Sequence, residues 1–285
     1  MSTTIYIPTD DCLQLESSLY SNNRQTSLPK GIILLNAGTC IKRQFYHTFC
    51  EELTAFGYDV LSYDYRGVGG SRPDRLKKYK ASIVDWGQLD IKAVIDWATK
   101  HYPSKKRYLI AHSMGGQVMG LAPNLNQLDK IVTVASSYGN WRNYTGSFKY
   151  KTALLWYTLI PIMTKFYGYM PAQKFGMGEN WPKGVTKNWW QWSKTNIPHS
   201  QLMEKHKIAH YYKEVTTPIR AYFLNDDNLA THKTIPQYQT DFSNVALDIQ
   251  QISPKDYGLE RLGHFGFFFP KSRQLWEETI DWFES

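Results

Sequence analysis

The feature that most constrains this 285-residue sequence is a regular alternation of short apolar runs with longer amphipathic segments. Uninterrupted apolar runs predict strands buried on both faces, whereas apolar residues about every 3.6 positions predict helices. The expected order is a strand at 31–35, a helix at 43–56, a strand at 59–63, a helix at 83–101, a strand at 107–111, a helix at 114–121 and a strand at 131–135. Strands joined by helical crossovers are parallel, so the pattern predicts an α/β fold whose sheet has helices on both faces.

The same pattern extends toward both ends of the chain. Extended segments at 4–7 and 13–20, separated by the turn-like sequence PTDD, predict an antiparallel hairpin. The alternation resumes after residue 215, with strands expected at 219–224 and 246–252 and helices at 234–242 and 272–283. We therefore predict a core that comprises residues 1–137 and 216–285.

Residues 138–215 interrupt this core with aromatic, helix-like pieces that contain several prolines. Six of the ten tryptophans lie in this segment, although it holds only roughly a quarter of the chain. Bulky aromatic side chains can pack a small helical subdomain, and together they suit the roof of an apolar pocket. We expect a helical cap, or lid. A homodimer contact and a membrane contact are both compatible with its surface, and the sequence does not choose between them.

The most informative motif is RYLIAHSMGGQ at 107–117, where an apolar strand runs directly into a helix. A sharp strand-to-helix turn exposes the serine and strains its backbone, so small residues are needed two positions before and after it. Ala111 and Gly115 meet that need on either side of Ser113. The motif predicts that Ser113 is a nucleophile, with a helix-capping serine as the alternative.

A serine nucleophile needs a base that accepts its proton, and His264 has the most suitable position among the eight histidines. It lies between the last predicted strand and the final helix, with glycines close on both sides. A loop there belongs to the same edge of the sheet as Ser113. His232 is the rival base, and His112 is expected to pack or to form hydrogen bonds within the fold.

The base in turn needs a carboxylate that orients it, and an acid pair follows the strand at 219–224. We predict Asp227 for this role. Asp226 is the alternative, because one residue of register decides which side chain faces inward, and the other aspartate is expected to form the turn. The resulting order of Ser113, Asp227 and His264 is one of the known triad orders.

Backbone N–H groups are expected to stabilise the negative oxygen that forms when a serine attacks a carbonyl group. The Met114 N–H, at the start of the helix after the nucleophile, is one predicted donor. The second is expected in the loop after the strand at 31–35, where Gly38 and Thr39 are both candidates. A plain strand-to-helix turn is the alternative for this loop.

No cofactor or metal ion is expected. The chain has no glycine-rich nucleotide-binding motif. His206 and His210 are four residues apart, but no glutamate follows the first of them and no third ligand is evident, so a surface helix is favoured over a metal site. The three cysteines suggest neither a disulfide framework nor a zinc site, and Cys40 lacks a base that would make it a nucleophile.

The chain carries 33 Lys and Arg residues against 25 Asp and Glu residues, for a net charge of +8. No nucleic-acid-binding module is recognisable, so nucleic acid is not an expected partner. The densest basic stretch, at 72–80, is either an ordinary solvated surface or an attractor of anionic ligands. The sequence shows neither a secretory signal pattern nor an apolar run of the ~20 residues that span a bilayer, so we expect a cytoplasmic protein without an integral membrane segment.

Over most of its length the chain resembles the α/β-hydrolase superfamily, and in particular a branch of bacterial predicted α/β hydrolases. The resemblance is carried by Asn36-Ala37-Gly38-Thr39, YDYRGVGGS at 63–71, AHSMGG at 111–116, Asp227 in FLNDD and GHFGFF around His264. It implies a mostly parallel sheet of eight strands, a cap inserted after the sixth strand, and a Ser-Asp-His hydrolase. Two positions depart from the usual pattern: Ala111 replaces the commoner glycine, and Asn36-Ala37 replaces His-Gly in the oxyanion loop.

These observations predict a serine hydrolase that cleaves a small-molecule carboxylic ester with an apolar acyl or alkyl group through an acyl-enzyme on Ser113. A peptidase, or a thioesterase or acyltransferase that uses the same triad, remains an alternative. The basic stretch at 72–80 would suit an anionic carrier such as coenzyme A. From another functional class, a non-catalytic ligand receptor with this fold also remains open.

Overall fold

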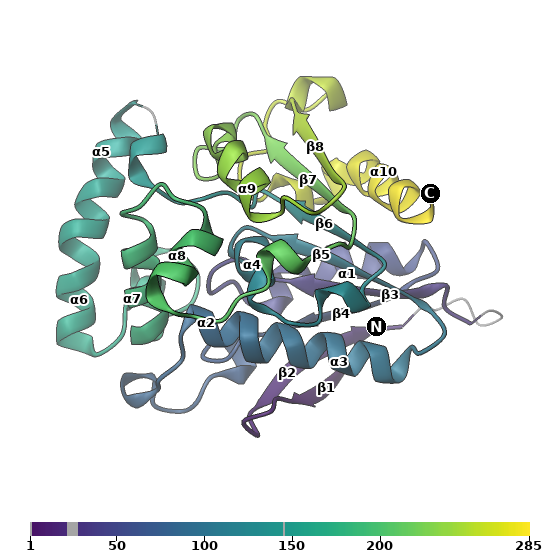
Figure 1. Ribbon diagram of the computed structural model, residues 1–285, viewed down its shortest axis with the longest axis horizontal. Helices are drawn as coiled ribbons and strands as arrows, with labels where there is room; N and C mark the ends of the chain where they lie inside the picture. Colours follow the sequence, from purple (N-terminus) through teal and green to yellow (C-terminus); the bar gives the residue numbers. More distant parts are fainter. Residues whose placement is uncertain (1, 22–27, 145) are drawn as a thin grey trace.

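The computed structural model describes residues 2–21, 28–144 and 146–285, and within them an eight-stranded sheet forms the centre of the molecule (Figure 1). The strands are β1 Ser2–Pro8, β2 Gln14–Tyr20, β3 Gly31–Asn36, β4 Asp59–Tyr63, β5 Lys106–His112, β6 Lys130–Val134, β7 Ile219–Leu224 and β8 Leu247–Ile252. Their spatial order is β1-β2-β4-β3-β5-β6-β7-β8. The β1–β2 and β2–β4 pairs are antiparallel, and the pairs from β4 to β8 are parallel. Both the predicted hairpin and the predicted parallel sheet are confirmed.

The central strands are buried on both faces because helices cover both sides of the sheet. Every residue of β3 and β4 is buried. The helices are α1 His47–Thr54, α2 Ile83–Asp85, α3 Lys92–His101, α4 Met114–Val118, α5 Gly146–Leu154, α6 Ile160–Tyr167, α7 Lys183–Trp192, α8 His199–His206, α9 Ile235–Asp241 and α10 Arg273–Glu284. In Figure 1, α1 lies behind the sheet and α3 lies in front of it. Helix α10 packs beside α1, where Phe49 and Trp276 meet with their rings 5.2 Å apart.

Two expected helices are less regular than predicted. The segment expected at 83–101 contains a π-helical turn, Trp86–Ile91, between α2 and α3. The segment expected at 114–121 is α4 followed by a 3-10 turn, Met119–Leu121. These two irregular turns pack against each other, with Gly87 so close to Leu121 that a Cβ at Gly87 would lie 2.4 Å from that side chain. The close approach of the two segments explains why a glycine occupies this position.

The loop after β4 is held by two buried arginines. The Arg66 guanidinium forms ion pairs with Asp90 at 2.7 Å and Asp11 at 2.8 Å. Arg43 forms ion pairs with Asp64 and Glu16. Asp64 and Arg66, the two charged residues of the YDYRGVGGS run, thus form buried ion pairs that stabilise this loop.

The segment between β6 and β7 contributes α5, α6, α7 and α8, which gather at one side of the sheet, at the left in Figure 1. It is attached to the core through α4 and α9. The Gln117 carbonyl oxygen in α4 accepts a hydrogen bond of 2.6 Å from the Tyr212 hydroxyl. The Asp241 carboxylate in α9 accepts hydrogen bonds from the N–H groups of His199 and Ser200 at 2.9 and 2.8 Å.

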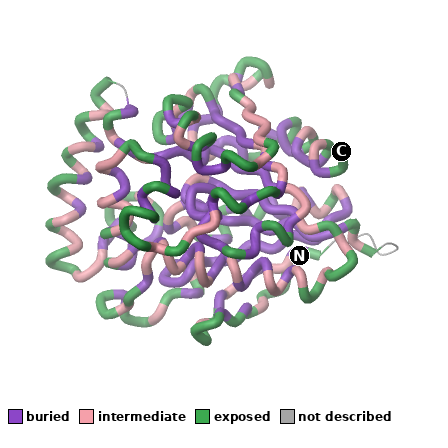
Figure 2. The backbone as a smooth tube through the Cα atoms, viewed as in Figure 1, coloured by how far each residue is buried: buried purple, intermediate pink, exposed green. Residues whose placement is uncertain are grey.

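Burial follows this arrangement. The strands are largely buried, whereas the outer helices α5 and α6 carry exposed residues along their length (Figure 2). Among the described residues, no helix is both long enough and apolar enough to traverse a bilayer.

Candidate active site

Ser113 occupies the sharp turn between β5 and α4. Its φ of 50° and ψ of −118° lie in a strained region that non-glycine residues rarely adopt. The Ser113 N–H donates to the Val134 carbonyl oxygen at 2.9 Å, which ties the turn to β6. A Cβ at Gly115 would lie 2.7 Å from the Ala37 carbonyl oxygen, so a glycine is required there for α4 to approach the end of β3. The strand, turn and helix expected from the sequence are thus all present.

The side chains of Ser113, His264 and Asp227 form one chain of hydrogen bonds. His264 Nε2 lies 3.0 Å from Ser113 Oγ. On the other side of the ring, His264 Nδ1 lies 2.7 Å from Asp227 Oδ2. The Asp227 side chain is 1% exposed and that of His264 is 11% exposed, so the carboxylate is shielded from water while the imidazole keeps limited access.

The two neighbouring aspartates after β7 contact different groups. Asp227 Oδ1 accepts hydrogen bonds from the N–H groups of Leu229 and Ala230, which leaves Oδ2 directed to His264. The Asp226 carboxylate instead accepts from the N–H groups of Leu262 and Gly263, each at 2.9 Å. Asp226 therefore anchors the loop that carries His264, rather than merely forming the turn expected from the sequence.

A second buried network lies behind this chain and involves Tyr46 and His112. The Tyr46 hydroxyl lies 2.7 Å from His112 Nδ1, and His112 Nε2 lies 3.0 Å from the His264 carbonyl oxygen. Since the carbonyl oxygen only accepts, Nε2 carries the proton and Nδ1 accepts from the tyrosine. Burial lowers the pKa of His112 well below its ordinary value, and the neighbouring His264 adds to this effect. His112 is therefore the hydrogen-bonding residue that was expected, while nothing in the sequence pointed to Tyr46.

The three expected oxyanion donors differ in their contacts. The Gly38 N–H donates to the Tyr46 hydroxyl at 3.0 Å. Among the described residues, no group accepts a hydrogen bond from the N–H of Met114 or of Thr39. The Tyr46 hydroxyl, which comes from a distant part of the sequence, thus contacts one of the two candidate loop donors, Gly38, and not the other, Thr39.

The rival residues lie in other settings. His232 is exposed at the start of a 3-10 turn, His232–Thr234. Helix α8 ends at His206, and the next residue has a positive φ of 56°, so His206 and His210 do not share a helix face. Burial raises the pKa of the Cys40 thiol, which opposes formation of the reactive thiolate.

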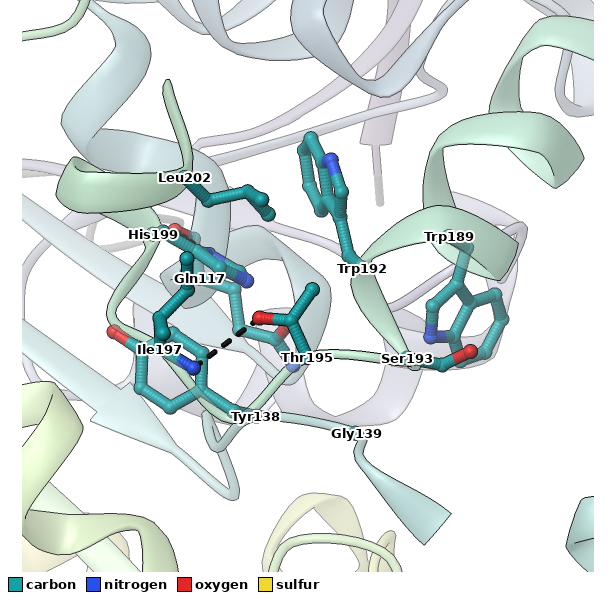
Figure 3. Close-up of a pocket in the computed structure, with 10 residues that line it drawn as sticks. All are labelled: Gln117, Tyr138, Gly139, Trp189, Trp192, Ser193, Thr195, Ile197, His199 and Leu202. Carbon is teal, nitrogen blue, oxygen red and sulfur yellow. Dashed lines mark hydrogen bonds between the residues drawn. The ribbon is translucent and has the colours of Figure 1, made fainter. Parts of the chain in front are cut away.

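Two cavities adjoin the segment 138–215. The first is only about 10 Å³, room for at most one water molecule, and lies where α7 and α8 meet α4 (Figure 3). Trp189, Trp192 and His199 line it, together with Gln117, one helical turn after Ser113. The second, about 460 Å³, lies between the basic stretch and the inserted segment, and is lined by Arg72, Asp74, Arg75, Leu76, Lys77, Lys78, Tyr169 and Asn180.

Solved structures with the same fold include several hydrolases. An esterase from Pyrococcus furiosus is 18% identical, with 99% of this chain and 91% of that chain covered and a TM-score of 0.60. A monoglyceride lipase from Saccharomyces cerevisiae is 13% identical, with 95% and 91% covered and a TM-score of 0.69. The thioesterase domain from the curacin biosynthetic pathway is 14% identical, with 98% and 99% covered and a TM-score of 0.58.

Comparison with protein families gives the classification. No curated protein sequence matches the chain. The family model described as serine aminopeptidase, S33 (Hydrolase_4) matches residues 27–222, well over half of the chain. The matched region includes the strained turn at Ser113, and the structural neighbours share the sheet around it. The chain therefore belongs to the serine aminopeptidase S33 family of α/β hydrolases.

Proposed function

We propose that the protein is a serine hydrolase that cleaves carboxylic esters through an acyl-enzyme on Ser113. The observation that carries this proposal is the continuous contact from Asp227 through the His264 ring to Ser113 Oγ. At 3.0 Å, His264 Nε2 is close enough to take the serine proton as Oγ attacks. Asp227 holds Nδ1–H and stabilises the positive ring that then forms.

The reaction has two halves that use the same groups. In the first, Ser113 Oγ bonds to the ester carbonyl carbon, and the N–H groups of Met114 and Thr39 stabilise the oxyanion. The intermediate collapses with cleavage of the bond to the alcohol oxygen, which takes the proton from His264 Nε2. In the second half, His264 removes a proton from water, the resulting hydroxide attacks the acyl carbon, and Ser113 leaves with the proton as the carboxylic acid departs.

An apolar acyl or alkyl group fits the aromatic character of the inserted segment. Trp156, Trp181 and Trp189 cluster there, with ring centroids 4.8 to 6.3 Å apart. We assign residues 138–215 the role of a lid over the substrate, because they are attached next to α4, directly after the nucleophile. The esterase and lipase among the structural neighbours are consistent with this substrate class.

Fluorophosphonate labelling, combined with turnover of p-nitrophenyl esters of increasing chain length, tests the proposal. We expect wild type to be labelled and to release p-nitrophenol, and Ser113→Ala to do neither while keeping its circular dichroism spectrum. The preferred chain length reports the size of the apolar site. Absence of labelling in folded wild type would overturn the proposal and favour a ligand receptor, whereas labelling without ester turnover would point to a peptidase or another acyl transfer.

A thioesterase is a second candidate, favoured by the basic cavity of about 460 Å³. Its four cationic side chains, Arg72, Arg75, Lys77 and Lys78, offer charge to a phosphate-bearing acyl carrier such as coenzyme A. In that case the KM for an acyl-coenzyme A should rise with salt, since screening weakens contacts between exposed charges. A KM for acyl-coenzyme A that does not change with ionic strength would contradict this second function.

A further inference from the structure

The positive charge of this protein is concentrated in the inserted segment. Residues 138–215 hold eleven of the 33 Lys and Arg residues but only three of the 25 Asp and Glu residues. The remainder of the chain has 22 residues of each sign, so its formal charge is zero. The whole net charge of +8 therefore belongs to the segment that lies beside the sheet in Figure 1.

The same segment carries a row of exposed apolar side chains. Helices α5 and α6 are joined by a π-helical turn, Leu155–Leu159, and form the outermost edge of the molecule in Figure 1. We use the term outer helix face for five residues on their solvent side. They are Tyr150, Leu154, Tyr157, Ile162 and Phe166, which are 71%, 65%, 44%, 43% and 74% exposed.

The π-helical turn brings these five residues onto one side. At about 100° per residue, a regular helix would rotate Ile162 and Phe166 well away from Tyr150 and Leu154. The turn inserts one extra residue and so restores their alignment. The opposite side, with Thr152, Trp156 and Ile160, is buried against the rest of the segment, which confirms that the exposed row is a distinct face.

Lysines surround the outer helix face and are available for an external partner. Among the described residues, Lys149, Lys151 and Lys165 form no ion pair. Further lysines lie over aromatic rings at the border: Lys194 is 5.6 Å from the Tyr157 ring centre, and Lys174 is 4.9 Å from that of Tyr167. Aromatic and aliphatic side chains bordered by cations are the pattern of helices that lie in the boundary between water and lipid headgroups.

We propose that the outer helix face docks on the surface of an anionic lipid bilayer. The apolar row enters the boundary between headgroups and acyl chains, and the lysines contact anionic headgroups. Charge complementarity selects this occupant over a second copy of the chain, because two faces that share a net charge of +8 per segment repel each other. The inference goes beyond the proposed hydrolase, since docking uses no residue of the Ser113 site.

Vesicle sedimentation tests the docking surface with the full-length protein. The probes are vesicles of phosphatidylcholine alone and of phosphatidylcholine with phosphatidylglycerol, at low and at high salt. The test variant combines Leu154→Glu and Phe166→Glu. The control combines Tyr6→Glu and Leu28→Glu, which introduces the same charge at two other exposed apolar residues, 58% and 81% exposed. Circular dichroism verifies that each variant is folded.

We expect wild type and the control to sediment with the phosphatidylglycerol vesicles, less so at high salt, and the test variant to bind about tenfold or more weakly. Equal binding to both vesicle types, no binding, or equal binding by wild type and the test variant would each overturn the proposal. A wild-type dimer that the test variant converts to monomer, seen by analytical ultracentrifugation without vesicles, would assign the face to a second copy instead. Fluorophosphonate labelling of Ser113 in solution reports the proposed hydrolase separately, so either proposal can fail alone.

Discussion

The Tyr46 hydroxyl lies 2.7 Å from His112 Nδ1, and this contact connects two loops that are distant in the sequence. On one side, the same hydroxyl accepts a hydrogen bond from the Gly38 N–H. On the other side, His112 Nε2 donates to the carbonyl oxygen of His264. The pair thus holds both the loop that contains Thr39 and the residue that contacts Ser113.

Replacing Tyr46 by Phe tests this connection. The change leaves the Gly38 N–H and His112 Nδ1 buried without partners, which should cost about 1–3 kcal/mol in free energy of unfolding. Because small displacements of reacting groups are costly, kcat for ester hydrolysis should fall by about 10- to 100-fold with a smaller effect on KM. Tyr20→Phe is the matched control, since the Tyr20 hydroxyl also contacts a histidine, His47, on the outside of the fold. An unchanged kcat in Tyr46→Phe would show that the pair has no positioning role.

The different contacts of Asp226 and Asp227 lead to a second prediction. In Asp227→Asn, an amide that can donate opposes His264 Nδ1–H, so the orientation and charge stabilisation of the ring are lost. We expect kcat/KM to decrease by about 10³-fold or more. Asp226→Asn keeps one oxygen that accepts from the backbone at 262–263, so its loss should be less than about tenfold. Steady-state kinetics of the two variants decide the assignment, and the reverse ranking would transfer the orienting role to Asp226.

A third prediction concerns the contribution of His199 to the pH dependence of the free energy of unfolding. Burial lowers the pKa of this histidine below its ordinary value, with a smaller opposing contribution from Asp241. In the unfolded chain the imidazole gains a proton as the pH falls through about 6.5, whereas the folded protein resists protonation to a lower pH. The unfolded state therefore binds more protons, so stability is full above pH ~6.5 and declines below it, by up to about 1.4 kcal/mol per pH unit.

Comparison with His199→Gln isolates this contribution. Burial raises the pKa of Asp90 to about 7, which gives a slope of opposite sign between pH ~4 and ~7, but that slope is common to wild type and variant. Urea denaturation at about pH 7 and pH 5 should show that the advantage of wild type over His199→Gln shrinks on acidification. His232→Gln, at an exposed histidine, should keep a constant difference from wild type. A constant difference for His199→Gln as well would contradict the prediction.

The buried pair of Arg66 and Asp90 supports a fourth prediction. Arg66→Met removes the partner of a carboxylate that is completely buried, which should lower the free energy of unfolding by about 3–5 kcal/mol near pH 7. Loss of the cation raises the pKa of Asp90 further above about 7, so the carboxyl of the variant is already largely neutral near pH 7, and the loss should be only slightly smaller near pH 5. Arg273→Met, which breaks exposed pairs with Glu52 and Glu277, should cost less than about 1 kcal/mol. Equal losses in the two variants would argue against the buried pair.

Local sequence patterns were sufficient for the fold. Apolar runs such as 31–35 and 107–111 are strands in the structure because a parallel sheet must bury both faces, whatever the loops do. The turn at Ser113 was also readable, since the need for a glycine at 115 arises from the neighbouring residues Asn36 and Ala37. Irregular helical turns, such as Trp86–Ile91, were not, because they reflect contacts with distant segments.

The candidate site shows the same division. Ser113, Asp227 and His264 could be chosen from the sequence because each follows or lies near the end of a strand, and parallel strands end at one edge of a sheet. The choice between Asp226 and Asp227 depends on which carboxylate faces the His264 ring. The choice between Gly38 and Thr39 depends on the Tyr46 hydroxyl, which lies in a segment expected only to be a helix.

The sequence by itself therefore determined the α/β architecture, the order of its strands along the chain and the residue types of the site. Only the tertiary structure decided which side chains meet, that Asp226 and Tyr46 support the loops of the site, and that an apolar row surrounded by lysines lies on the outside of α5 and α6. The reason is physical: periodicity reports whether a residue faces the core, whereas hydrogen-bond partners depend on the distances between segments that only packing brings together.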